Sequence, residues 1–396
     1  MPEFHDVVVI SGVRTAVGTY GGSFKSIPPS ELAAKVVQEA VQRSTLEPDA
    51  IQHSVFGNII HTDARDPYMG RVAAVDGGLP VTTPAFTLNR LCGSGLQAIV
   101  SAAQMIMLGD IETAVAGGAE NMTRSPYWSS STRWGQRLGH GQLTDAMVAA
   151  LHDPFHDCHM GITAENLADK YNISREDQDK LAVLSHQRAA NAIASGHFKE
   201  QILPVEIKSR KSTVVFDTDE HVRKDVNLAD LAKLKPAFRN DGTVTAGNAS
   251  GLNDGASAVI LSSSEYAEQN GLKPMARLVG YGFAAVEPEF MGIGPVPAIK
   301  NVMAKTGMQI ADMDVIELNE AFAAQALAVM RELDLPEDKP NPNGSGISLG
   351  HPIGATGCII TVKALYELKR INGKYALVTM CIGGGQGIAA IFENIA

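Results

Sequence analysis

The stretch "NRLCGSGLQA" from Asn89 to Ala98 places a cysteine directly before a glycine-serine-glycine turn. The run "AFTL" before it is typical of a short buried strand, and the run "LQAIVSAAQMIML" after it is typical of a helix that Gly109 ends. Cys92 is therefore expected close to the N-terminus of a helix. Free backbone N–H groups and the helix dipole favour a thiolate there, so we expect a lowered pKa for this cysteine.

Two interpretations of this turn are open. In the first, Cys92 is a nucleophile. In the second, "GSGLQA" is a G-x-G-x-x-A turn that seats the pyrophosphate of a dinucleotide, with Glu120 at roughly the 20-residue distance expected of a ribose-binding acid. The glycine pattern alone is common by chance, and the dinucleotide interpretation gives no role to the histidine and thiol motifs further along the chain.

Three later motifs share the character of this turn. They are "NEAF" at Asn319–Phe322, "GHPIGATG" at Gly350–Gly357 and "CIGGGQG" at Cys381–Gly387. Each lies where a strand or loop leads into the next element, the place where α/β proteins put functional groups. A thiol with an ordinary pKa of about 8.5 is mostly protonated at neutral pH, so a histidine that takes its proton raises its reactivity. Together the motifs supply a nucleophile, a base, a second thiol and an amide.

The elements that must position these groups occur twice in the chain. Residues 31–58 read as helix, turn and strand and end in Asn58; residues 296–319 read the same way and end in Asn319. A glycine-punctuated turn, an apolar helix and another strand follow in both halves, which indicates a duplicated α/β unit. The helix after Cys92 has almost no charged face, so we expect it between two sheets, as the central layer of a layered α/β fold.

A segment of different composition separates the halves. Residues 121–244 contain both tryptophans, and the part from Lys199 to Arg239 has nine Lys and Arg against seven Asp and Glu. We therefore expect an insertion with a mildly basic surface. The predicted division is 1–120 plus 245–271 for the first half, 121–244 for the inserted loop domain, and 272–396 for the second half.

Composition excludes several classes of protein. The 396 residues carry a formal charge of −10, which gives no support to nucleic-acid binding. No 18-residue apolar stretch suggests a membrane span, and the start lacks the basic region of a secretion signal. No pair of the four cysteines has C-x-x-C spacing, so we expect no metal site and free thiols in a reducing cytoplasm.

The motifs in combination resemble those of the thiolase family. "NRLCGSGLQA", "GNASGLNDGA", "NEAF", "GHPIGATG" and "CIGGGQG" follow in thiolase order over essentially the whole chain, which is most similar to the bacterial acetyl-CoA acetyltransferase and β-ketothiolase group. One departure is Ala16, where many members have proline. The resemblance implies duplicated α/β halves in an αβαβα arrangement with an inserted loop domain.

The activity that the resemblance implies is reversible Claisen condensation of two acyl-CoA molecules, or thiolysis of short-chain 3-ketoacyl-CoA. Acyl-CoA and CoA are then substrates, no cofactor is tightly bound, and the expected assembly is a homodimer or homotetramer. Cys92 would carry the acyl group, His351 would accept its proton, and Cys381 would act on the α-carbon of the second substrate. His351 with a water on Asn319 would form one oxyanion hole, and the N–H groups of Cys92 and Gly383 the other.

The resemblance also implies a set of CoA-binding residues. His159 and Met160 would line the pantetheine and acyl pocket, and Arg223 would hold the CoA nucleotide or its pantetheine arm. The remaining members of the set are Ala246, Ser250 and Phe322.

Two rival functions stay open at this point. Ketoacyl synthases of the same fold pair their cysteine with two histidines, whereas Cys381 here favours a thiolase. A non-catalytic CoA-binding protein would be expected to lack one of Cys92, Asn319, His351 or Cys381, and all four are present.

Overall fold

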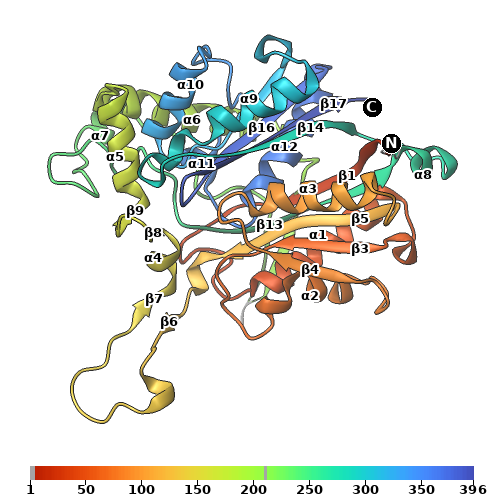
Figure 1. Cartoon of the computed structure of the whole chain (residues 1–396), viewed down its shortest axis with the longest axis horizontal. Coiled ribbons are helices and arrows are strands. Elements are labelled where there is room, and N and C mark those ends of the chain that lie inside the picture. The colour runs from red at the N-terminus through yellow and green to blue at the C-terminus, as the bar shows by residue number, and fades with distance from the viewer. Residues whose placement is uncertain (1–4, 209–211) are drawn as a thin grey trace.

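The computed structural model describes residues 5–208 and 212–396. Its strands form a sheet with the order β15-β16-β17-β14-β1-β13-β5-β3-β4, and two short strands, β10 and β2, pair with β1 and β13 at its side (Figure 1). The strands of the first half are β1 (Val7–Thr15), β2 (Gly18–Thr19), β3 (His53–Gly57), β4 (Ala85–Leu88), β5 (Thr113–Asn121) and β13 (Asn253–Ser263). Those of the second half are β14 (Ala276–Ala285), β15 (Val315–Leu318), β16 (Tyr375–Ile382) and β17 (Gln386–Asn394).

The strand order is that of two similar sheets joined at one narrow seam. In the first half β4, β3 and β5 are parallel neighbours, followed by antiparallel β13 and β1. In the second half β15 and β16 are parallel, followed by antiparallel β17 and β14. Between the halves, β1 and β14 pair only at Val8↔Arg277 and Val9↔Ala276. The duplicated α/β halves expected from the sequence are therefore present in the same element order.

Helices complete the layers. α3 (Ser94–Met107) packs on β3 and β5 of one sheet and on α12 (Thr356–Ile371), which packs on β15 and β16 of the other. α1 (Pro29–Ser44) and α2 (Met69–Asp76) cover the outer face of the first sheet, and α9 (Pro295–Thr306), with α10 (Ala323–Glu332) beside it, covers the second (Figure 1). The expected αβαβα arrangement is confirmed, because the apolar helix after Cys92 is covered on both sides.

Two glycines let the central helices approach each other closely. A Cβ atom at Gly95 would lie 2.7 Å from the backbone nitrogen of Cys358, and one at Gly357 would lie 2.3 Å from that of Leu96. Both distances are shorter than any normal contact, so only glycine fits. The first turns of α3 and α12 therefore meet backbone to backbone, which brings the Cys92 turn beside the motif that contains His351.

One expectation about the strand before this turn is wrong. The run Ala85–Leu88 was expected to be buried, but β4 is the edge strand of the sheet and pairs only with β3. The side chain of Phe86 is 39% exposed. An apolar run of four residues does not distinguish a central strand from an edge strand, because both can carry such residues.

The segment between β5 and β13 lies outside the two sheets except where β10 joins β1. It contains α5 (Met160–Lys170) and α6 (Arg175–Ala194), and β6 and β7 form an arm that projects from the molecule (Figure 1). Its other elements are β6 (Tyr127–Trp128), β7 (Thr144–Asp145), α4 (Ala146–Ala150), β8 (His152–Asp153), β9 (Cys158–His159), β10 (Ile202–Leu203), β11 (Val205–Lys208), β12 (Thr213–Phe216) and α7 (Leu228–Leu231). The division at residues 120, 245 and 272 stays a prediction that this strand order favours.

Shorter helices connect the remaining elements. They are α8 (Ser264–Gln269), α11 (Gly346–Leu349) and the 3-10 helices η1 (Pro48–Ala50), η2 (Asp66–Tyr68), η3 (Met122–Arg124), η4 (Thr132–Trp134), η5 (Pro288–Ile293) and η6 (Ile310–Asp312). Within residues 5–208 and 212–396, no helix combines the length and the apolar character that a bilayer crossing requires.

Candidate active site

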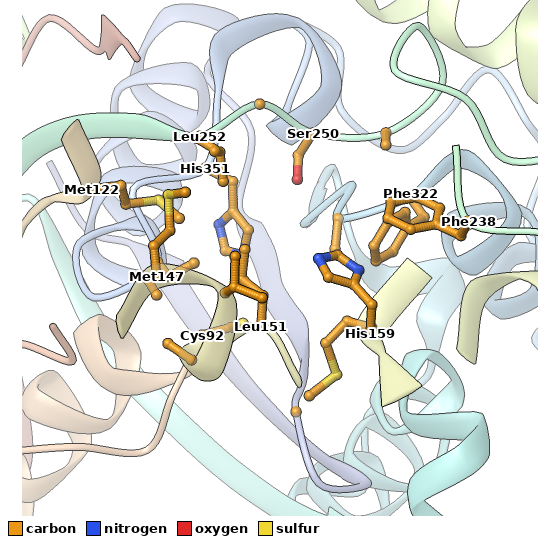
Figure 2. Close-up of a pocket in the computed structure, with 18 of the residues that line it drawn as sticks. Cys92, Met122, Met147, Leu151, His159, Phe238, Ser250, Leu252, Phe322 and His351 are labelled. Carbon is orange, nitrogen blue, oxygen red and sulfur yellow. The ribbon is translucent and has the colours of Figure 1, made fainter. Parts of the chain in front are cut away.

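A cavity of about 390 Å³ lies where both halves and the inserted segment meet. Figure 2 shows Cys92 and His351 on one side, near Met122, Met147 and Leu151, and His159 with two phenylalanines on the other. The predicted site residues that line it are Cys92, His159, Met160, Ala246, Ser250, Phe322, His351, Cys381 and Gly383. Asn319 lies directly behind His351, and Arg223 lies in an adjoining groove. The structure thus brings together residues that are up to 291 positions apart.

Cys92 lies in a tight turn immediately before α3, as expected. Leu91 has a φ of 45°, uncommon for a residue other than glycine. The hydroxyl of Ser94 stabilises the turn, because it accepts a hydrogen bond from the Arg90 N–H at 2.9 Å and donates one to the Leu91 carbonyl at 2.7 Å. The turn holds the half-buried Cys92 side chain at the wall of the cavity.

The protonation state of Cys92 differs from the expectation. Burial raises the pKa of the Cys92 thiol to about 11, and the charge of Glu120 adds to this effect. Hydrogen bonds from the backbone N–H groups of Gly383 and of Cys92 itself act in the opposite direction but are outweighed. The expected lowering was wrong because a few N–H groups at a helix start do not offset the loss of water around a sulfur anion. Cys92 is therefore a thiol at neutral pH, and a nucleophilic role for its sulfur would require a base.

His351 lines the same cavity as Cys92 and has a hydrogen-bonded ring. Its Nδ1 lies 2.7 Å from the Thr356 hydroxyl, and that hydroxyl donates its only proton to the Pro352 carbonyl at 3.0 Å. We assign the ring proton to Nδ1, because the Thr356 oxygen can accept it while its hydroxyl donates to Pro352, and Nε2 then keeps a free lone pair. Burial lowers the pKa of His351 to about 4, so the ring is neutral at neutral pH. The Asn253 side chain fixes its backbone by accepting from the His351 N–H at 3.0 Å.

The positions of Asn319 and Cys381 follow from the parallel pairing of β15 and β16. Leu318 is in register with Thr379, and the Asn319 N–H donates to the Thr379 carbonyl at 3.0 Å. The Asn319 side-chain nitrogen lies 3.4 Å from Nε2 of His351, and its buried Oδ1 has no hydrogen-bond partner among the described residues. Cys381 is fully buried, and burial, together with the nearby Cys92, raises the pKa of its thiol. The second thiol is therefore also protonated at rest.

The glycines after Cys381 bring backbone to the cavity. Gly384 and Gly385 have φ angles of 76° and 81°, a conformation that favours glycine. A Cβ atom at Gly383 would lie 2.8 Å from Cε of Met160 and 3.2 Å from Cδ1 of Leu91, so a side chain there would narrow the space in front of Cys92. The absence of side chains leaves the Gly383 N–H free to point at the sulfur.

The opposite wall of the cavity is aromatic. His159 caps α5 by accepting a hydrogen bond from the Gly161 N–H at Nδ1, at 3.0 Å, so Nε2 carries its ring proton. The ring stacks on Phe238, with centroids 4.7 Å apart, and Phe238 meets Phe322 edge-on at 6.1 Å (Figure 2). Burial lowers the pKa of His159. This wall offers flat apolar faces and one N–H donor to an extended ligand.

Arg223 is separated from the catalytic groups. It lines a surface groove of about 450 Å³ together with Lys224 and Asp230. A narrow space lined by Arg223, Ala246 and Ala249 lies between this groove and the cavity, and the two alanines also line the cavity itself. A ligand with a long flexible arm can therefore reach from Arg223 to Cys92.

Comparison with known proteins identifies the family. Residues 7–265 match the model of the thiolase N-terminal domain, and residues 272–394 match that of the thiolase C-terminal domain. The chain belongs to the thiolase family. It is 62% identical to the β-ketothiolase BktB of Cupriavidus necator over 98% of this chain and 99% of that protein. It is 47% identical to an acetyl-CoA acetyltransferase of Chromobacterium violaceum over 98% and 100% of the two chains.

Solved thiolase structures have the same fold. The acetyl-CoA acetyltransferase of Bacillus anthracis superposes with a TM-score of 0.98 at 49% identity and covers 100% of both chains. Human mitochondrial 3-ketoacyl-CoA thiolase in complex with CoA superposes with a TM-score of 0.96 at 43% identity, over 99% of this chain and 98% of that one. The thiolase resemblance and the fold class expected from the motifs are both confirmed.

The dinucleotide interpretation of the Cys92 turn finds no support in this thiolase. Glu120, the acid proposed to bind ribose, is fully buried. Its carboxylate accepts from the Asn58 amide at 3.2 Å and from the backbone N–H groups of Ile59, Ile60 and Gly354 at 3.1, 3.1 and 3.0 Å. These donors occupy both oxygens, so Glu120 holds the loop after β3 against the loop that contains Gly354.

Several residues of the site were missed by sequence reasoning. Thr356 hydrogen-bonds Nδ1 of His351, Asn253 holds the His351 backbone, and Phe238 stacks on His159. Thr356 and Asn253 lie inside two of the quoted motifs, "GHPIGATG" and "GNASGLNDGA", so their positions were available as a signal. Phe238 lies in the inserted segment, and no local pattern marked it.

Proposed function

We propose that this thiolase condenses two acetyl-CoA molecules to acetoacetyl-CoA and, in reverse, cleaves short-chain 3-ketoacyl-CoA with CoA, through an acyl-enzyme on Cys92. The observation that carries the proposal is the convergence of two thiols, one neutral histidine and the Gly383 N–H at one end of an apolar cavity. CoA and acyl-CoA are substrates, and the reaction needs no tightly bound cofactor.

In the first half-reaction, Cys92 attacks the thioester carbonyl of acetyl-CoA. The proton of Cys92 moves to Nε2 of His351, since Nδ1 already carries a proton, which it donates to Thr356. The bond between the acyl carbon and the CoA sulfur then breaks, and the acetyl group stays on Cys92. The departing CoA sulfur takes the proton of the Cys381 thiol and leaves as CoA. The products are an acetyl thioester on Cys92, an imidazolium and a Cys381 thiolate. The opposite charges of the last two offset the cost of burying each.

In the second half-reaction, the Cys381 thiolate removes an α-proton from a second acetyl-CoA. The resulting carbanion forms the carbon–carbon bond to the acyl carbon on Cys92, whose bond to sulfur breaks. The Cys92 thiolate recovers its proton from His351, so every group returns to its starting state. The raised pKa of Cys381 makes its thiolate a strong enough base for this weakly acidic proton.

Two sets of donors stabilise the negative oxygens that form. We assign the N–H groups of Gly383 and Cys92, which already point at the sulfur, to the acyl oxygen on Cys92. We assign Nε2–H of the protonated His351, with a water held by Asn319, to the thioester oxygen of the second substrate. The unpartnered Oδ1 of Asn319 supports this assignment, because a buried amide oxygen is suited to accept from such a water.

We assign the CoA moiety to the path from the Arg223 groove to the cavity. Phosphates fit the basic end of this groove, and the pantetheine arm fits between Ala246, Ser250 and the stacked pair of His159 and Phe238. Met160 and Phe322 complete the apolar lining near the acyl end.

We further propose that the thiolase acts in the cytoplasm as a homodimer or homotetramer. The arm formed by β6 and β7 supports self-association, because Trp128, Trp134 and Leu138 are 55%, 84% and 97% exposed. Light scattering checks the assembly, and a monomer at assay concentration would contradict it.

The test of the reaction is labelling of the intermediate. After incubation with acetyl-CoA labelled in the acetyl group, acid quench and digestion, the label is expected on the peptide that contains Cys92. In the thiolysis direction, double-reciprocal plots of initial rate against 3-ketoacyl-CoA at several CoA concentrations are expected to give the parallel lines of a ping-pong reaction. Label only on Cys158, Cys358 or Cys381 would contradict the assignment.

A further inference from the structure

The loop of residues 217–226, which contains Arg223, is held against the catalytic core by groups outside the active site. Asp219 pairs with Arg14 of β1 through both oxygens, with distances of 2.7 and 2.9 Å. Both side chains are buried, and Asp219 also accepts from the Val17 N–H at 2.8 Å. The remaining Arg14 nitrogen, Nε, donates to the Gln201 side chain at 2.7 Å.

The next residue continues this attachment. The Glu220 carboxylate accepts from the Thr19 hydroxyl at 3.1 Å and from the Ser23 N–H at 3.2 Å. The Glu220 N–H donates to the Val17 carbonyl at 3.2 Å. The carboxylates of Asp219 and Glu220 are thus engaged with the first half of the chain and do not neutralise Arg223.

His186 fixes the position of Arg223 itself. It lies in α6, is 3% exposed, and its Nδ1 accepts a hydrogen bond from the Arg223 backbone N–H at 3.1 Å. His221 stacks on the His186 ring, with centroids 6.4 Å apart. The His221 ring leaves no room for a Cβ atom at Gly251. His221 therefore packs directly against the backbone of Gly251, which lines the cavity beside Ser250.

We infer that Arg14 and His186 are positioning residues for CoA: they hold the 217–226 loop so that the Arg223 guanidinium faces the phosphates of the nucleotide before the substrate arrives. This inference rests on the proposed use of acyl-CoA. Preorganisation matters here because a loop that must be ordered on binding reduces affinity. A thioester without a nucleotide does not reach Arg223, so its reaction does not depend on the loop.

The experiment compares two acyl donors in single-turnover acylation of Cys92. Acetyl-CoA contains the nucleotide, and acetyl-N-acetylcysteamine ends within the pantetheine arm. In His186→Leu, the half-saturating concentration of acetyl-CoA is expected to rise about tenfold, the factor that one lost hydrogen bond represents. The maximal acylation rate and the acylation by acetyl-N-acetylcysteamine are expected to stay within about twofold of the unmodified protein, because no reacting group changes.

Two further variants separate positioning from general damage. His186→Asn keeps an acceptor close to the place of Nδ1 and is expected to restore most of the affinity for acetyl-CoA. His197→Leu is the matched control, because His197 follows the end of α6 and bonds Asn343 at 3.0 Å, away from the loop. It is expected to bind acetyl-CoA as the unmodified protein does.

Arg14→Lys provides an independent test should His186→Leu not fold. It keeps the charge but loses the two-pronged contact with Asp219 and the bond to Gln201, so a selective loss for acetyl-CoA is expected again. Equal losses with both donors, or no loss with either, in a folded His186→Leu or Arg14→Lys variant overturn the inference. Failure of the unmodified protein to be acylated by either donor contradicts the proposed function instead.

Discussion

Replacing Thr356 with valine tests the assignment of the His351 tautomer. Valine has nearly the shape of threonine but removes the oxygen that accepts from Nδ1–H, now 2.7 Å away. A buried donor without an acceptor costs about 1–3 kcal/mol. The ring can avoid this cost by moving its proton to Nε2, where the unpartnered Oδ1 of Asn319 becomes an acceptor after rotation of the amide.

The magnitude follows from that penalty. A cost of about 1.4 kcal/mol or more for the Nδ1–H form reduces the fraction with a free Nε2 lone pair to about 10% or less. Acylation of Cys92 is therefore expected to slow about 10- to 100-fold, because the pKa of the thiol, about 11, makes a base necessary. Half-saturation by acetyl-CoA is expected to change little, since Thr356 does not line the cavity.

The assay is the single-turnover rate of label transfer from acetyl-CoA to Cys92. Thr361→Val is a matched control, because Thr361 is buried in the same helix. Its hydroxyl donates to the Gly357 carbonyl at 2.7 Å, four residues earlier, as the Thr356 hydroxyl donates to the Pro352 carbonyl, but it does not contact His351. It is expected to keep the original rate, and Thr356→Ser is expected to keep most of it. An unchanged rate in Thr356→Val, or an equal loss in Thr361→Val, would refute the tautomer argument.

Three other outcomes are expected. Cys92→Ala should abolish both half-reactions, whereas Cys381→Ala should still accumulate label on Cys92 but lose condensation and α-proton exchange by about 10²–10⁴-fold; full condensation in Cys381→Ala would make that thiol a core residue. Gly383→Ala should lower kcat by about 10²–10³-fold, as for a lost oxyanion donor, because its Cβ displaces the turn against Met160 and Leu91, and a kcat near the original would remove Gly383 from that role. Burial lowers the pKa of His186 to about 4, below that of the unfolded chain, so between these values the unfolded state binds the proton and stability falls as pH falls. The unfolding free energy of the unmodified protein should therefore drop about 2 kcal/mol more than that of His186→Asn between pH 7 and pH 5, as denaturant titrations at both pH values can measure; equal drops would show that His186 takes up a proton as readily in the folded state as in the unfolded one.

The sequence contained enough to predict the layered fold and candidate catalytic groups, of which Cys92, His351 and Cys381 line one cavity. The duplicated order of helix, strand and glycine turn predicted two similar halves, and the strand registers place Asn319 beside the end of β16 as parallel pairing requires. The apolar sequence of α3 predicted a helix covered on both sides. These features are local or periodic, so they can be recognised without knowing which segments meet.

The features that could not be predicted depend on long-range contacts. The pKa of Cys92 was expected to be low from its place at a helix start, but its burial is set by residues of both halves and of the inserted segment, among them Met122, Met147 and Ile353. Arg14 was not among the predicted site residues, yet it holds Asp219 across 205 positions of sequence. The role assigned to Thr356 depends on the contacts of its hydroxyl with Nδ1 of His351 and with the Pro352 carbonyl, which no local pattern in the sequence indicated.

The backbone contact at Gly95 and Gly357 makes the proposed site a joint property of both halves. The proposed nucleophile comes from the turn before α3 and the proposed base from the loop before α12, and the two helices touch where neither has a side chain. If the two halves were produced as separate chains, each would therefore lack part of the site until they docked at these glycines. The two copies of the unit differ at one strand end: Glu120 follows Asn58 by 62 residues in the first half, and Cys381 follows Asn319 by the same 62 residues in the second. At the end of β5 in the first half, Glu120 therefore holds two loops together, and at the end of β16 in the second half the corresponding residue is the thiol of Cys381.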